Sequence, residues 1–300
     1  MGYCLLHDFA AADDVTDSDF DCVSTTTKPN VKICIFSDDE DIYVSRRIRS
    51  WGAWERHLTD TISQLMSFFP DPTFVDVGAN VGIHSLVVAK RGYRVVAVEP
   101  QQECITRFVK SVKLNGLQEN IVLVKNAVFN SRQKLSLNLA DDNKGAASLH
   151  FEFDASQSIK SVLMDDLLEV ILPPDGASLS NDVILKLDIQ ASEYKALMNS
   201  TQFFRRLNVQ AIIMEWEEMA RLLRDSTFKD RQQILDMVVT LRQLGYVAYS
   251  LETYLTESNE GEELSDADLR SPLINVAWVK PNIFMSVDSK GNVKVERVVV

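Results

Sequence analysis

A short apolar run that breaks into a glycine turn constrains the fold more than any other feature of this sequence. Residues 74–77 read Phe-Val-Asp-Val and suit a buried parallel strand, after which the chain turns at Gly78 and enters a helix at Gly82. Glycine permits the tight turn, and Gly82 is expected to leave room for a ligand beside the helix N-terminus, where unpaired N–H groups point outward. A carboxylate or a ribose would suit such a site.

A second apolar strand, residues 93–98, ends at Glu99 and Pro100. An acid about 20 residues beyond a glycine turn is a typical partner for a ribose diol, because both strands then end at the same edge of a parallel sheet. A solvated acid at a strand end is the alternative interpretation of Glu99. The turn reads Gly-Ala-Asn-Val-Gly and lacks the third glycine of a dinucleotide-binding fingerprint, so its spacing argues against NAD.

Strands and helices alternate beyond the turn, which predicts a doubly wound α/β sheet. The predicted strands are residues 74–77, 93–98, 121–128, 183–187, 209–214, 246–251 and 274–280, and the predicted helices include 59–68, 84–90, 102–114 and 231–244. A β insertion is predicted at 134–139, 147–153 and 158–163, a helix start at 164–168, and an acidic surface loop at 257–268.

The chain is expected to form one α/β domain with an N-terminal extension. Residues 1–30 are rich in Asp, Ser and Thr and predict a flexible lead-in. Residues 31–72, with short strands at 31–36 and 42–45, are expected to cap the cleft. The main domain is expected at 73–285, and a tail at 286–300, where the alternation in 293–300 suits an edge strand.

Composition limits the partners and the location. The formal net charge of −12 lacks the basic character that binding to a phosphate backbone requires, so nucleic acid is excluded as a partner. No apolar run approaches the ~20 residues that span a bilayer, and the first residues do not resemble a signal peptide, so a soluble, cytoplasmic protein is expected.

The cysteines and histidines do not predict a metal site. Cys4, Cys22, Cys34 and Cys104 show no C-x-x-C spacing, and the apolar strand pattern around Cys34 predicts a buried free thiol there. The four histidines are scattered along the chain without a pair at helical spacing, so no metal ligands are expected.

Six ordered motifs resemble those of the FkbM-type methyltransferases. They are Val-Asp-Val-Gly-Ala-Asn-Val-Gly (75–82), Val-Glu-Pro (98–100), Leu-Asn-Gly (114–116), Asn-Ala-Val (126–128), Met-Asp-Asp-Leu-Leu (164–168) and Lys-Leu-Asp-Ile-Gln-Ala-Ser-Glu (186–193). The resemblance implies a class I, Rossmann-like methyltransferase fold with an antiparallel strand at 274–280, and S-adenosylmethionine as the cofactor. Ala191 stands where the family usually has Gly, and its methyl group is expected to narrow the pocket.

The resemblance also implies which residues hold the cofactor. They are Asp76, Gly78, Ala79, Asn80, Gly82, Glu99, Pro100, Asn126, Ala127 and Asp188, with adenine beside Asn126 and with Trp54 and Glu55 closing over the cleft. The alternative for Trp54 and its neighbour Trp51 is a pair of core anchors. The alternative for Asp76 is to hold the N–H groups of its own turn.

Methyl transfer to an alcohol requires alignment of the reacting atoms and a base that removes the hydroxyl proton. Asp188 is the first candidate base, and Glu215 and His84 are the others, each with a structural alternative. The resemblance implies O-methylation, and we expect the acceptor to be a small molecule or glycan. A non-catalytic binding protein with this fold and a nucleotide-linked oxidoreductase are the other hypotheses, and no pattern indicates the oligomeric state.

Overall fold

The structure is a computed structural model that describes residues 3–9, 19–140, 143–150, 158–172, 180–251, 263–271, 273–287 and 292–298. A central seven-stranded sheet has the order β12-β13-β11-β10-β3-β4-β5. Its strands are β3 (Thr73–Val77), β4 (Arg94–Val98), β5 (Ile121–Val124), β10 (Asp182–Leu187), β11 (Asn208–Glu215), β12 (Val247–Ser250) and β13 (Asn275–Val279). β13 runs antiparallel to β11 and β12, and the other neighbouring pairs are parallel. The predicted class I, doubly wound α/β fold is confirmed.

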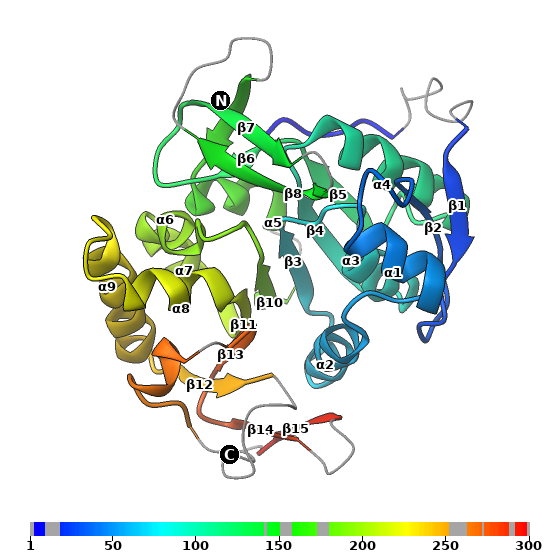
Figure 1. The fold of residues 1–300 in the computed structure, drawn as a ribbon. Coiled ribbons are helices and arrows are strands. Elements are labelled where there is room, and N and C mark those ends of the chain that lie inside the picture. Colours follow the sequence, from blue (N-terminus) through cyan, green and yellow to red (C-terminus); the bar gives the residue numbers. More distant parts are fainter. Residues whose placement is uncertain are drawn as a thin grey trace.

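Helices cover both faces of this sheet (Figure 1). One face carries α1 (Val44–Trp51), α2 (Arg56–Ser67), α3 (Ile83–Lys90) and α4 (Gln102–Asn115), and the other carries α5 (Leu168–Ile171), α6 (Glu193–Met198), α7 (Thr201–Arg206), α8 (Glu217–Arg224) and α9 (Arg231–Gln243). A hydrophobic core lies on each side of the sheet, and successive strand residues alternate between these two cores. Phe74 belongs to the core on the side of α1 to α4, and Val75 belongs to the core on the side of α5 to α9. The strands are mostly apolar because both of their faces are buried, and Asp76 and Lys186 are buried charged exceptions.

The predicted third strand, residues 121–128, is wrong as a single strand. β5 ends at Val124, and β6 (Ala127–Val128) leaves the central sheet to pair with β9 (Ser158–Val162). Asn126 lies at the break, where its Oδ1 accepts the N–H of Leu5 at 2.7 Å and its Nδ2 donates to the carbonyl of Lys160 at 3.1 Å. This buried amide therefore holds the turn between the two sheets.

The predicted β insertion is present. β7 (Lys134–Ala140) and β8 (Asn143–His150) join β6 and β9 in a four-stranded sheet of order β6-β9-β7-β8. Residues 151–153 of the predicted strands and residues 257–262 of the predicted acidic loop lie outside the described residues. The predicted helix start is a 3-10 turn, Met164–Leu167, that leads into α5.

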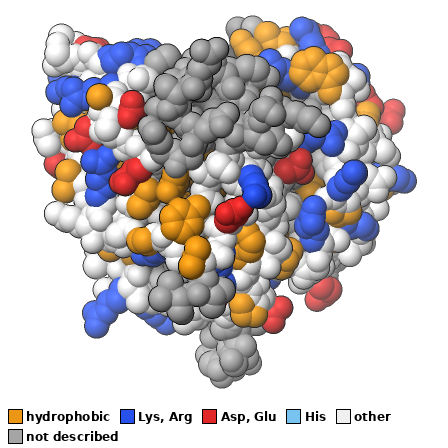
Figure 2. All heavy atoms as spheres, turned by 90° about the horizontal axis from the view of Figure 1, so that it is seen from below, with side chains coloured by type: hydrophobic (Ala, Val, Ile, Leu, Met, Phe, Trp, Pro, Cys, Tyr) orange, Lys and Arg blue, Asp and Glu red, His pale blue; other side chains and the backbone are white. Residues whose placement is uncertain are grey.

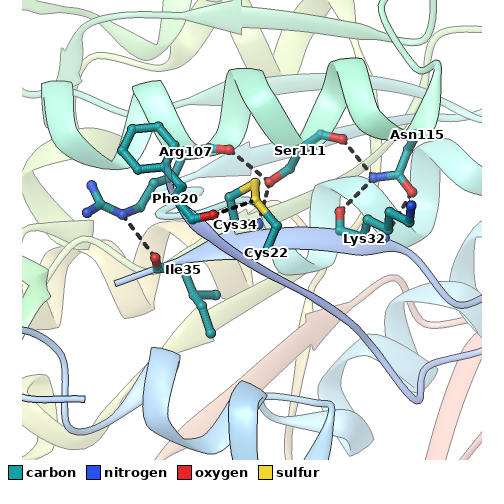
Figure 3. Close-up of a disulfide and its surroundings, with 8 residues drawn as sticks. All are labelled: Phe20, Cys22, Lys32, Cys34, Ile35, Arg107, Ser111 and Asn115. Carbon is teal, nitrogen blue, oxygen red and sulfur yellow. Dashed lines mark hydrogen bonds between the residues drawn. A yellow bond between two sulfur atoms is a disulfide. The ribbon is translucent and has the colours of Figure 1, made fainter. Parts of the chain in front are cut away.

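The N-terminal segment differs from the predicted flexible lead-in. β1 (Asp21–Ser24) pairs with β2 (Lys32–Ile35), and their antiparallel register places Cys22 opposite Cys34, where the two form a disulfide (Figure 3). The predicted free thiol at Cys34 is wrong, because only strand pairing brings these two cysteines together. Disulfides persist in oxidising compartments and are rare in the cytosol, so this bond does not support a cytoplasmic location.

Side chains of α4 hold the disulfide-bonded strand pair against the domain (Figure 3). Ser111 Oγ accepts the N–H of Cys34 at 2.8 Å. Asn115 accepts the N–H of Lys32 at 3.0 Å and donates to the Lys32 carbonyl at 2.6 Å. These bonds satisfy backbone groups of β2 that strand pairing leaves open.

The predicted strand at 42–45 is instead the beginning of α1. The carboxylate of Asp41 accepts the N–H groups of Val44 at 3.0 Å and Ser45 at 2.8 Å, together with the Ser45 hydroxyl. An acid at this place satisfies the first free N–H groups of a helix and favours its start.

The C-terminal tail forms a small sheet of its own. β14 (Ile283–Val287) pairs with β15 (Val293–Arg297), so the predicted edge strand exists but does not extend the central sheet. The side chain of Gln64 on α2 donates to the Val293 carbonyl and accepts the Val295 N–H, which ties this sheet to α2. Among the helices that the structure describes, none has the length and apolar character needed to cross a membrane.

Candidate active site

A cavity of about 1020 Å³ opens where β3, β4, β10 and β11 end. It is lined by most of the predicted site residues, namely Trp54, Glu55, Gly78, Ala79, Asn80, His84, Glu99, Pro100, Asn126, Ala127, Asp188 and Glu215. Asp76 and Gly82 are not part of the lining. Parallel strands bring their carboxyl ends to one edge of the sheet, which explains how residues far apart in sequence share this cavity.

The two turn glycines are required by packing within the protein. Gly78 has φ +82°, and a Cβ built on it would lie 1.8 Å from the backbone oxygen of Asp188. Gly82 has φ +86°, and its Cβ would lie 2.3 Å from the ring of Phe108. The prediction that Gly82 leaves room for a ligand is therefore wrong, because the helix of Phe108 occupies that space.

The N–H groups of the turn are also used within the protein. The Val98 carbonyl at the end of β4 accepts the N–H groups of Gly78 at 2.9 Å and Ala79 at 3.1 Å. The next N–H group, that of Asn80, donates to Glu99 Oε2 at 2.8 Å. These three N–H groups are not available to a ligand, because β4 and Glu99 lie close enough to accept them. The expectation of outward-pointing N–H groups at the N-terminus of α3, which begins at Ile83, stays a prediction.

Glu99 is a buried carboxyl group on the cavity wall. Its Oε2 accepts the Asn80 N–H and its Oε1 accepts the Gln101 N–H, each at 2.8 Å, and 6% of the residue is exposed. Burial raises the pKa of Glu99 to about 7. The alternative of a solvated acid is therefore wrong. Each carboxylate oxygen accepts more than one hydrogen bond, so Glu99 keeps the capacity to bind ligand hydroxyls.

A buried lysine that sequence analysis did not assign to the site organises its acids. Lys186 Nζ lies 3.2 Å from Asp188 Oδ2 and 3.6 Å from Asp76 Oδ1. Burial opposes its charge, but the carboxylates of Asp188 and Asp76 outweigh it and raise the pKa of Lys186. Asp76 also accepts a hydrogen bond from the Ser85 hydroxyl at 2.6 Å. Its carboxylate therefore contacts Lys186 and Ser85 and does not hold the N–H groups of its own turn. The sequence signal for this role was the position of Lys186 within an otherwise apolar predicted strand.

Two further acids beside Asp188 carry raised pKa values. Burial, followed by the charge of Asp188, raises the pKa of Glu215 well above its usual range, and Gln190 Nε2 donates to Glu215 Oε2 at 3.1 Å. Glu193 accepts the Ile189 N–H at 2.8 Å, and burial raises its pKa to about 8. Crowded carboxyl groups of this kind favour a cationic ligand, whose charge would restore their ionised form.

His84 and Glu55 form a second pair on the wall. His84 Nδ1 lies 2.9 Å from Thr59 Oγ1, and its Nε2 lies 3.8 Å from Glu55 Oε2. Asn275, from β13, donates to Glu55 Oε1 at 3.0 Å. Burial opposes ionisation of Glu55, but His84, Asn275 and Lys186 outweigh it and lower its pKa to about 2. Glu55 is therefore a permanent negative charge.

The tryptophan pair divides between the core and the surface. Trp54 is half-buried and packs against the hydrophobic core on the side of the sheet that α1 to α4 cover. Trp51 is 67% exposed and also lines the cavity. The alternative of two core anchors is therefore wrong for Trp51, because the end of α1 places its ring at the surface.

Ala191 does not line the cavity, so the predicted narrowing of the pocket by its methyl group is wrong. The departure from the family affects the backbone instead, because Ala191 has φ +62° in a region that favours glycine.

The Ala191→Gly variant should therefore be more stable than the native chain by about 0.5–1 kcal/mol, since relief of the left-handed strain exceeds the added entropy of the unfolded chain. Urea unfolding measures this difference. Ala196→Gly, inside α6, should lower stability by about 1 kcal/mol or more and serves as the opposite control. Equal losses in both variants would contradict the strain at Ala191.

Within the described ranges, no group of three or more His, Cys, Asp or Glu side chains is placed to hold a metal ion.

Residues 76–248 match the family model described as the methyltransferase FkbM domain.

Solved structures are similar at low identity. The O-methyltransferase TomG from Streptomyces achromogenes, involved in tomaymycin synthesis, is 12% identical over 78% of this chain and 86% of its own, with a TM-score of 0.45. An O-methyltransferase from Bacillus cereus is 11% identical over 80% of this chain and 98% of its own, with a TM-score of 0.39.

Proposed function

This chain belongs to the FkbM methyltransferase family, and from that premise we propose that it methylates a hydroxyl oxygen on a small molecule or glycan. The cofactor is S-adenosylmethionine, which supplies a methyl group on a positively charged sulfur. The observation that supports the proposal most strongly is one cavity lined both by the buried carboxyl group of Glu99 and by a second acid with a raised pKa, Glu215.

The residues present fit that cofactor. Glu99 sits at the end of β4 with free acceptor capacity for the two ribose hydroxyls. Asp188, Asp76 and Glu55 lie around the positive charge of Lys186, so acidic groups outnumber the cation there, which suits a sulfonium cation. The cavity, at the upper end of the ~300–1,000 Å³ range of ligand sites, has room for an acceptor as well.

We assign the proton transfer to the pair of Asp188 and Glu215. Asp188 Oδ2 lies 3.2 Å from Lys186 Nζ, which fixes the side chain in place to orient a hydroxyl group. Burial raises the pKa of Glu215 well above its usual range, so its ionised form is a stronger base than an ordinary carboxylate. His84 already contacts Thr59 and faces Glu55, so its role is to position Glu55.

Nucleic acid is not the proposed acceptor. The net charge is −12, and acidic and basic side chains are mixed over the face of the molecule in Figure 2, without a continuous basic area. A phosphate backbone is bound through clustered lysine and arginine side chains.

Calorimetric titration with S-adenosylhomocysteine and NAD, followed by transfer of a labelled methyl group, tests the proposal. We expect S-adenosylhomocysteine to bind and the label to appear as a methyl ether on an acceptor hydroxyl. Binding of NAD alone would overturn the proposed function, and label found on nitrogen or carbon would overturn O-methylation.

The affinity for S-adenosylhomocysteine should rise about tenfold from pH 6 to pH 8. Ribose hydroxyls donate to the ionised form of Glu99, and with a folded pKa of about 7 this form is scarce at pH 6 and dominant at pH 8. In Glu99→Gln the affinity should be at least tenfold lower at pH 8, and its pH dependence should be lost. A pH dependence that persists in the variant would assign it to another group.

A further inference from the structure

Arg47, one of two arginines that line the cavity, is not paired with an acid, and the other, Arg56, donates to Thr26. Arg47 lies on the exposed side of α1 and lines the cavity together with Trp51 and Trp54. Its guanidinium carbon lies 5.6 Å from the centre of the Trp51 ring and 5.2 Å from that of Trp54. Within the part of the chain that the structure describes, no ion pair of Arg47 with a carboxylate is formed.

This state of Arg47 contrasts with its neighbours on α1. Arg49 pairs with Asp21 and Asp38, and Arg46 donates to the Asp38 carbonyl at 2.8 Å. The chain has 43 acidic and 31 basic residues, so acids are numerous enough to pair with a surface arginine. Two indole rings instead hold the guanidinium in place by cation–π contacts and leave its N–H groups available.

The cavity brings acids and a cation together. Asp188 and Glu215 lie at the ends of strands, and the segment before β3 contributes the acids Glu55 and Asp60 as well as Arg47 beside Trp51. An anionic group would be repelled by the acids and attracted by Arg47. A flat ring could lie against Trp51, which is exposed and lines the cavity.

We propose that the acceptor is a hydroxylated ring compound that carries a carboxylate. The carboxylate pairs with the planar fork of Arg47, the ring lies against Trp51, and the hydroxyl group points to Asp188 and Glu215. This inference rests on the proposed O-methylation and names the acceptor class. Aromatic hydroxy acids and sugar acids share this chemistry.

Matched pairs of probes test the proposal in the full-length protein, with and without S-adenosylhomocysteine. The pairs are 4-hydroxybenzoate against its methyl ester, and glucuronate against glucose, measured by calorimetry. In at least one pair, the acid should bind at least tenfold more tightly than its neutral partner. The pair that shows the preference tells aromatic acids from sugar acids.

Variants separate Arg47 from the general charge of the protein. Arg47→Ala should reduce the preference for the acid at least tenfold, Arg47→Lys should restore part of it, and Trp51→Ala should weaken both members of a pair. Arg46→Ala, on the same helix, should leave binding unchanged. Thermal unfolding of each variant checks that the exposed substitutions leave the fold intact.

The outcomes distinguish the two proposals. If S-adenosylhomocysteine binds but neither acid is preferred, or the preference survives in Arg47→Ala, the assignment of the acceptor is overturned and the proposed function stands. If the label transfer fails while the acid preference depends on Arg47, the site binds anions but the proposed O-methylation falls.

Discussion

The Gly78→Ala variant is expected to lose the site and most of its stability. The added Cβ would lie 1.8 Å from the backbone oxygen of Asp188, and neither group can move without separating β3 from β10 at the centre of the sheet. We expect a loss of more than about 4 kcal/mol in the free energy of unfolding, and no binding of S-adenosylhomocysteine. Urea unfolding and calorimetric titration measure the two effects.

Gly92→Ala provides the matched control. Gly92 also has a positive φ, +93°, but nothing lies within 4 Å of the Cβ position, so the variant suffers only the backbone strain of about 1–2 kcal/mol. It should bind the cofactor normally. If Gly78→Ala were as stable as Gly92→Ala, the close approach of the turn to Asp188 would be wrong.

The second large effect is expected at Glu215. Glu215→Gln keeps the shape of the side chain and removes its ability to take a proton, so kcat should fall at least about a hundredfold, while the affinity for S-adenosylhomocysteine changes less than tenfold. In the native enzyme kcat should increase as the pH rises through the raised pKa of Glu215, because only the ionised form is a base. Methyl-transfer rates between pH 5 and pH 9 measure this.

Asp188→Asn tests the pairing of the two acids. Without the charge of Asp188, the pKa of Glu215 is raised less, so the rising limb of the pH profile should move to lower pH, and kcat should fall at least about a hundredfold through loss of orientation. Glu218→Gln, an exposed acid that pairs with Arg221, should leave kcat unchanged. Full activity in Glu215→Gln would instead make His84 the candidate base.

Local patterns were sufficient to predict the framework of this protein. The mostly apolar runs at 93–98 and 183–187 predicted strands that form within one residue of these bounds, because burial on both faces favours apolar side chains at successive positions. The acid after the second strand, Glu99, reaches the cavity because parallel strands end at a common edge. Three of the family motifs, at 75–82, 98–100 and 186–193, lie at such strand ends, and the motifs together indicated the cofactor as well.

The partners of these residues were decided by the tertiary structure. Cys22 meets Cys34 through strand register, Gly82 meets Phe108 through helix packing, and Glu55 meets Asn275 across 220 residues of sequence. Neighbouring residues carry no information about such distant contacts.

The same is true of the chemistry of the site. Glu99 and Glu215 are ordinary strand-end acids in sequence, and only burial and the charge of nearby residues raise their pKa values. The sequence by itself therefore determined where the acids stand along the chain. Desolvation and the placement of Lys186, which exist only in the folded protein, decided which of them stay ionised and which can take a proton.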